Sequence, residues 1–144
     1  MADPAYSKPL KELYDEISED GQLGIDNTVR LIRRNLGFCY LFLFIATLAP
    51  VLSLNFVPSS ESIETWFQRS GAVIVVFGLF AELKASKIRQ LSCTDTKPFL
   101  YDSIYLKRKY SSLALLTDTF CAIAIVAGTI VWGYGDFIWK LTCT

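Results

Sequence analysis

The stretch that decides the fold is Leu36–Phe56, LGFCYLFLFIATLAPVLSLNF, which carries no charged side chain. It lies within an uncharged window of 26 residues between Arg34 and Glu61. A helix needs about 20 apolar residues to cross a hydrocarbon core of about 30 Å, so this run is long enough. Pro50 lies inside the run, and a membrane helix tolerates an interior proline more readily than a helix in water does. The run predicts a first transmembrane helix over about 36–56.

A second apolar window is shorter, and it can cross a membrane only if the residues on both sides of it are included in the span. SGAVIVVFGLFA, residues 70–81, has twelve residues between Arg69 and Glu82. We therefore expect a second span over about 66–86, with Arg69 and Glu82 as anchors near the two interfaces, where their side chains can reach water. A re-entrant or surface-lying segment is the alternative.

The third apolar window runs from Tyr110 to Tyr134 and is interrupted only by Asp118. It predicts a third span over about 111–133. Trp132 and Trp139 are the expected anchors at one interface, because tryptophan is enriched at the boundary between membrane and water.

Composition supports the same class of protein. Of 144 residues, 52% are hydrophobic and 19% charged, and the mean hydropathy is +0.36. The charged share lies below the roughly 25% of ordinary soluble domains. A water-soluble bundle would show polar faces at helical spacing, and neither Leu41–Ile45 nor Val73–Phe80 does. We predict an all-α integral membrane protein with three transmembrane helices. The 14 basic and 14 acidic residues balance, so no net field indicates direct contact with nucleic acid.

The basic residues predict the orientation. Twelve of the 14 lie before the first span or between the second and third, and only Arg69 and Lys140 lie on the other side. Positive residues stay in the cytoplasm, so we expect the N-terminus inside and the C-terminus outside. The expected location is the bacterial inner membrane. The expected division is a cytoplasmic N-terminal helical segment, 1–35, and a three-span membrane domain, 36–144, with a cytoplasmic loop at 85–110.

Short cytoplasmic helices are predicted before the first span. Over 8–20, apolar residues recur at helical spacing, and Gly21 and Gly24 are expected to end this helix. Asp26 or Asn27 is expected to cap a second helix that continues into the span. We expect the first helix to dock on the protein's own basic loop or on a neighbouring copy. In that loop, Lys107, Arg108 and Lys109 are candidates for contact with lipid headgroups or a partner.

Asp118 is the most informative residue, because the predicted span places it near the midplane, where a charge is costly. Small and polar residues follow it along one helical stripe that includes Ala122, Thr129, Gly133 and Asp136. The stripe indicates an interhelical hydrogen bond, a pore lining, or a shifted span with Asp118 at the interface. In the second span, close helix packing, including packing between copies, is expected at Gly71, Gly78, Ala81 and Ala85, together with Ala122.

Gly133–Asp136, GYGD, resembles the end of the potassium-channel selectivity filter. Trp132, however, stands where that family has valine. We therefore expect an interfacial turn in which the glycines end the third helix and Asp136 caps the next segment.

The residue types argue against catalysis and cofactors. The chain has no histidine, and its four cysteines show no metal-ligand spacing; Cys143 could cross-link two copies outside the cell. No phosphate loop or nucleophile motif is present, so no enzyme, metal or cofactor is expected, and a lipid-modifying enzyme ranks last.

These observations favour a non-enzymatic membrane subunit, assembled from several copies and in contact with membrane lipids. It would act as a scaffold, sensor or effector with a cytosolic partner bound through 1–35 and 85–110, as in a bacterial stress or phage-defence system. The alternative is a pore-forming or ion-conducting oligomer lined by the Asp118 stripe.

Overall fold

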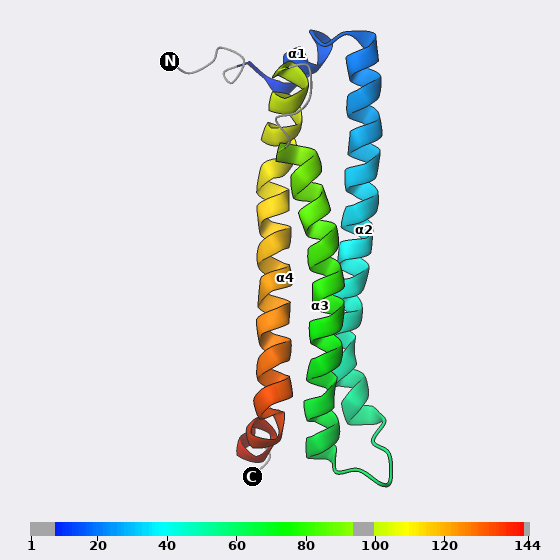
Figure 1. Cartoon of the computed structure of the whole chain (residues 1–144), viewed down its shortest axis with the longest axis vertical. Helices are drawn as coiled ribbons and strands as arrows, with labels where there is room; N and C mark the ends of the chain where they lie inside the picture. Colours follow the sequence, from blue (N-terminus) through cyan, green and yellow to red (C-terminus); the bar gives the residue numbers. More distant parts are fainter. Residues whose placement is uncertain (1–7, 94–99, 143–144) are drawn as a thin grey trace.

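The computed structural model describes residues 8–93 and 100–142, and in this part of the chain there are four helices and no strand. They are α1 (Leu10–Asp15), α2 (Glu19–Asn55), α3 (Ile63–Cys93) and α4 (Leu100–Thr142). Figure 1 shows α2, α3 and α4 side by side as three long rods, with α1 at the end that holds the N-terminus. α3 packs along both of the other long helices, whereas α2 and α4 contact each other much less.

The N-terminal helices differ from the prediction. α1 ends at Asp15, and α2 begins directly after Ser18, whose Oγ accepts a hydrogen bond from the Gly21 N–H at 3.4 Å. Gly21 and Gly24 therefore lie inside α2 rather than ending a helix, and neither Asp26 nor Asn27 caps one. Each interior glycine costs about 1 kcal/mol relative to alanine, a cost that burial of large residues such as Ile25 can offset.

The long helices extend well beyond the predicted spans. At 1.5 Å per residue, the 37 residues of α2 reach about 55 Å and the 43 residues of α4 about 64 Å. The predicted loop at 85–110 is mostly helix, because α3 continues to Cys93 and α4 begins at Leu100. The predicted turn at Gly133–Asp136 is wrong, since α4 continues through it to Thr142. Cys143 lies outside the described residues.

The buried positions of α3 recur alternately every three and four residues, which is the spacing of a coiled-coil seam. On α3 these positions are mostly small: Gly71, Ile74, Gly78, Ala81, Ala85, Ile88 and Ser92. The facing residues of α4 include Ala114, Thr117, Cys121, Gly128 and Gly135. Small residues let the two backbones approach closely, as in packed membrane helices.

A separate apolar core closes the end of the bundle next to α1, which we call the head. Leu13 and Ile17, which are 0% and 8% exposed, bring the N-terminal segment onto α4. The Tyr14 hydroxyl also donates to Asp26 of α2 at 3.2 Å. The buried members of this core are Leu13, Ile17, Ile25, Ile32, Ile88, Ile104, Tyr105, Leu106, Tyr110 and Ala114.

Within residues 8–93 and 100–142, two helices are long and apolar enough to cross a membrane, α2 and residues 103–141 of α4. Only 17% and 22% of their most apolar windows are buried in the bundle, whereas the core helix of a soluble protein is mostly buried. Large apolar side chains such as Phe44, Phe56 and Phe120 face outward. α3 does not meet the same criteria of length and apolarity. The uncharged stretch between its Arg69 and Glu82 has only twelve residues, 70–81.

Candidate functional site

The strongest polar contact between two long helices joins α3 to α4. Arg89 Nη1 lies 2.6 Å from Asp118 Oδ2, and the Asp118 side chain is 16% exposed while that of Arg89 is 55% exposed. The other carboxylate oxygen, Asp118 Oδ1, is buried and accepts no hydrogen bond from the residues that the structure describes. The predicted interhelical role of Asp118 therefore takes the form of an ion pair.

Two thiols lie in the apolar layer beside this ion pair. Cys39 of α2 and Cys121 of α4 are fully buried, and their Sγ atoms are 3.7 Å apart. Ala81 and Ala85 of α3 complete the layer, so the three long helices meet there. Glu82 also lies at this level, half-buried, and forms no ion pair within the described ranges.

The pairing of α3 with α4 shows that two predicted spans are out of register. Asp118 lies opposite Arg89, three residues beyond the predicted end of the second span, and Gly135 lies opposite Gln68 at the other end. The predicted span 66–86 of α3 therefore faces about 118–137 of α4, not 111–133. The difference is roughly four to seven residues, or about 6–10 Å at 1.5 Å per residue.

The predicted stripe of α4 divides between two faces. Asp118 and Asp136 are half-buried, whereas Ala122, Thr129 and Gly133 face outward. The Thr129 hydroxyl donates to the carbonyl of Ile125 in its own helix at 2.8 Å. Ala122 therefore has no buried packing role within one chain, and a pore lined by the stripe would require several copies.

The predicted packing residues of α3 act within the chain. A Cβ added at Gly71 would lie 2.3 Å from the backbone N of Trp132, and one at Gly78 would lie 2.9 Å from Ile125 Cγ1. Ala81 and Ala85 are fully buried. These small residues therefore set the approach of α4 to α3, and they are not free to pack against another copy.

The predicted interfacial anchors Arg69, Trp132 and Trp139 gather at the end opposite the head. Arg69 Nη1 lies 2.8 Å from Glu61 Oε1, and the rings of Phe67 and Trp139 are 5.6 Å apart. The Gln68 side chain donates to the carbonyl of Trp132 at 2.9 Å. Lys140 pairs with Glu64 at 3.6 Å.

Two of the three clustered basic residues form contacts in the head, and one of these contacts joins α4 to the N-terminal segment. Arg108 Nη1 donates to the backbone carbonyl of Lys8 at 2.7 Å. Lys109 Nζ donates to the Tyr105 hydroxyl at 2.8 Å and lies 5.0 Å from the centre of that ring. The hydrogen bond to Tyr105 raises the pKa of Lys109 above its usual value. Lys107 is exposed.

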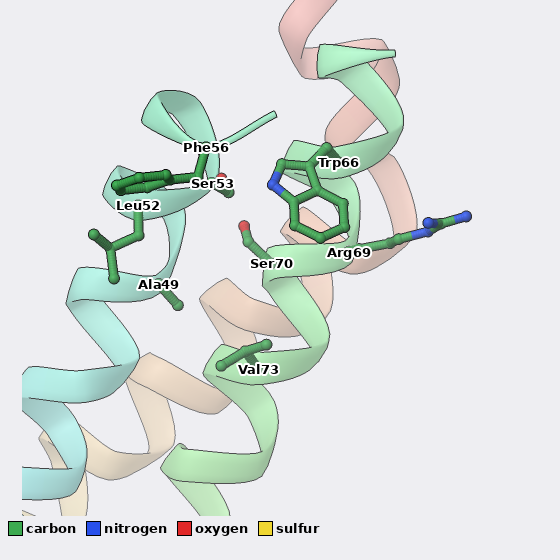
Figure 2. A pocket seen from close by; sticks show the side chains of 8 residues that line it. All are labelled: Ala49, Leu52, Ser53, Phe56, Trp66, Arg69, Ser70 and Val73. Atoms are coloured by element: carbon green, nitrogen blue, oxygen red, sulfur yellow. The ribbon is translucent and has the colours of Figure 1, made fainter. Parts of the chain in front are cut away.

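A groove between α2 and α3 at the end away from the head was not predicted. It has a volume of about 230 Å³, and Figure 2 shows Ser53, Trp66 and Ser70 with apolar neighbours around it. Trp66 Nε1 is buried and has no hydrogen-bond partner among the described residues. No local sequence pattern indicates this groove, because residues 49–56 and 66–73 meet only through the hairpin of α2 and α3.

The part of the chain that the structure describes contains no group of three or more Cys, Asp or Glu side chains that could hold a metal ion. No family model, no curated protein and no solved structure matches this chain.

Proposed function

We propose that this chain is a non-enzymatic integral membrane subunit that crosses the bilayer three times and carries a small helical head in the cytoplasm. It would act as a scaffold, sensor or effector and assemble with further copies of itself. The observation that carries the proposal is the continuity of α2, α3 and α4, which run without a break from an outward-facing apolar surface into the core of the head.

The exposed apolar surface supports a location in the bilayer. Phe44 and Phe120 are 62% and 57% exposed. In water, such outward-facing side chains would leave a large apolar surface in contact with solvent, which is unfavourable. In lipid they are in contact with acyl chains. α3 lies between the other two helices and would cross with them, its Arg69 and Glu82 reaching water near the two surfaces.

The helix pairing suggests a revised position for the bilayer. If the uncharged residues 70–81 of α3 occupy its centre, about 20 residues of each helix lie in the hydrocarbon core. The spans would be about 36–56, 66–86 and 118–138. Asp118 and Arg89 then lie together at the cytoplasmic boundary, where an ion pair is far less costly than at the midplane. Lys107–Lys109 would lie about 13 Å or more beyond this boundary.

The charge distribution supports the orientation. The basic residues of 8–34, 84–93 and 100–109 lie at the head end, while Arg69 and Lys140 lie at the other end. The head would therefore be cytoplasmic, in an inner membrane of bacterial type. A cytosolic partner would meet the outer surfaces of α2 and of residues 85–93 and 100–110, since the apolar stripe of the N-terminal segment is already occupied by α4.

Cysteine labelling in intact cells tests the topology. In a background with the native cysteines replaced by serine, Ser59→Cys lies in the loop between α2 and α3 and Asn27→Cys in the head, both exposed. We expect an impermeant thiol reagent to label Ser59→Cys directly and Asn27→Cys only after permeabilisation. The reverse pattern would overturn the orientation, and release of the chain by alkaline carbonate would overturn the membrane location.

Particle mass and conductance test the role. Native mass spectrometry in nanodiscs is expected to show more than one copy without ion conduction in planar bilayers. A closed ring that conducts, and whose conductance changes in Thr129→Val, would replace the scaffold proposal with the pore alternative. A monomer would remove the proposed self-assembly.

A further inference from the structure

The groove between α2 and α3 has apolar walls and a small polar patch. Its lining comprises Ala49, Leu52, Ser53, Phe56, Trp66, Arg69, Ser70 and Val73. The Phe56 side chain is 72% exposed and is one of the apolar residues that line the groove. Pockets that enclose a whole drug-sized ligand measure about 300–1,000 Å³, so about 230 Å³ accommodates only one end of a long molecule.

The polar atoms beside the groove are one buried donor and two acceptors on buried serines. The Ser53 hydroxyl donates to the carbonyl of Pro50 at 2.7 Å, and the Ser70 hydroxyl donates to the carbonyl of Phe67 at 2.6 Å. Both hydroxyl hydrogens are therefore used, and only oxygen lone pairs remain. The indole N–H of Trp66 has no acceptor in the described residues. Figure 2 shows this nitrogen and the two serine oxygens directed toward the space between the two helices.

No charge complements this patch. The Arg69 side chain extends away from the groove in Figure 2, and its guanidinium is paired with Glu61 at 2.8 Å. A phosphate or carboxylate group would therefore find no counter-charge inside, and burying one unpaired is unfavourable. A neutral group that accepts and donates at once fits better, and a hydroxyl is the simplest such group.

We propose that this groove binds the hydroxyl end of a neutral lipid alcohol of the diacylglycerol class. The lipid hydroxyl would accept from Trp66 Nε1–H and donate to the oxygen of Ser53 or Ser70, while the adjoining chain lies against Leu52, Phe56 and Val73. This assignment rests on the proposed membrane location. There the groove lies at the outer ends of the spans, at the depth of the polar atoms of lipids.

Lipid retention in native mass spectrometry tests the site. The purified full chain in detergent would be titrated with dioctanoylglycerol and, separately, with its acetylated counterpart, which lacks the hydroxyl hydrogen. We expect Trp66→Phe to reduce the dioctanoylglycerol adduct about fivefold, the usual net effect of one hydrogen bond. The double variant Ser53→Ala/Ser70→Ala should reduce it similarly. Trp132→Phe is the matched control, because Trp132 lies on an exposed face of α4.

The outcomes separate the lipid site from the membrane proposal. Equal adducts in the wild-type chain and Trp66→Phe, or equal retention of the acetylated lipid, would overturn the lipid-alcohol site. The wild-type chain would meanwhile remain in the carbonate-resistant membrane fraction, which the location test measures independently. Trp66→Phe removes an unpaired donor together with part of an apolar ring, so its helicity and unfolding midpoint are measured alongside binding. Reduced binding with an unchanged midpoint would report on the site itself.

Discussion

Replacing Gly71 by alanine tests the close approach of α3 and α4. The new Cβ would lie 2.3 Å from Trp132 N, 2.7 Å from Gly128 O and 2.8 Å from Trp132 Cα. Atoms in good contact are separated by about 3.5 Å, so the helices would have to separate locally by about 1.2 Å. All three atoms belong to the backbone, and no rotamer change can relieve the overlap.

The cost can be estimated against a matched control. Gly133→Ala adds the same methyl group to α4, where no atom lies within 4 Å of the new Cβ. Both variants gain the same helix propensity, up to about 1 kcal/mol, so the difference between them isolates the overlap. Overpacking typically costs about 1–3 kcal/mol, and the rigid contacts here favour the upper end. A difference of about 3 kcal/mol corresponds to about 150-fold in the unfolding equilibrium.

The assay is unfolding in mixed micelles by titration with sodium dodecyl sulfate, followed by circular dichroism. Gly71→Ala should unfold at a clearly lower mole fraction of the denaturing detergent than the wild-type chain, and Gly133→Ala at an equal or higher one. Gly78→Ala should be intermediate, because its new Cβ would meet the Ile125 side chain, which can move. Equal midpoints for Gly71→Ala and Gly133→Ala would refute the pairing of the two helices.

Three further contacts can be tested in the same preparation. With Cys93 and Cys143 replaced by serine, oxidation with iodine should join Cys39 to Cys121, whose Sγ atoms are 3.7 Å apart, within one chain; a gel shift that persists in Cys39→Ser would contradict this contact. A double-mutant cycle of Arg89→Gln and Asp118→Asn should give a coupling free energy of about 1 kcal/mol, modest because the arginine is 55% exposed; strictly additive effects would exclude the ion pair. Arg108→Gln should speed tryptic cleavage at Lys11 about fivefold, since it removes a bond of about 1 kcal/mol that holds the N-terminal segment. Lys107→Gln on the exposed side of α4 is the control, and equal rates in both variants would argue against that role for Arg108.

The sequence alone determined that the protein is helical and where its apolar stretches lie. Uncharged runs such as Leu36–Phe56 are local properties, because helix formation and membrane partitioning depend on the side chains of one segment. The seven-residue spacing of Gly71, Gly78 and Ala85 likewise indicated a closely packed face, and in the structure these residues lie against other helices of the chain.

The tertiary structure alone decided which residues of different helices meet. The sequence placed Asp118 near the midplane of its predicted span, but packing pairs it with Arg89 and places α4 about 6–10 Å from the predicted register. The tertiary structure likewise places Ser53, Trp66 and Ser70 around one groove. It also brings the Arg108 side chain into a hydrogen bond with the backbone carbonyl of Lys8. Such pairings depend on the axial register at which the small residues of two antiparallel helices pack most closely. This register depends on the shapes of both helix surfaces together, so it cannot be predicted from the sequence of either helix alone.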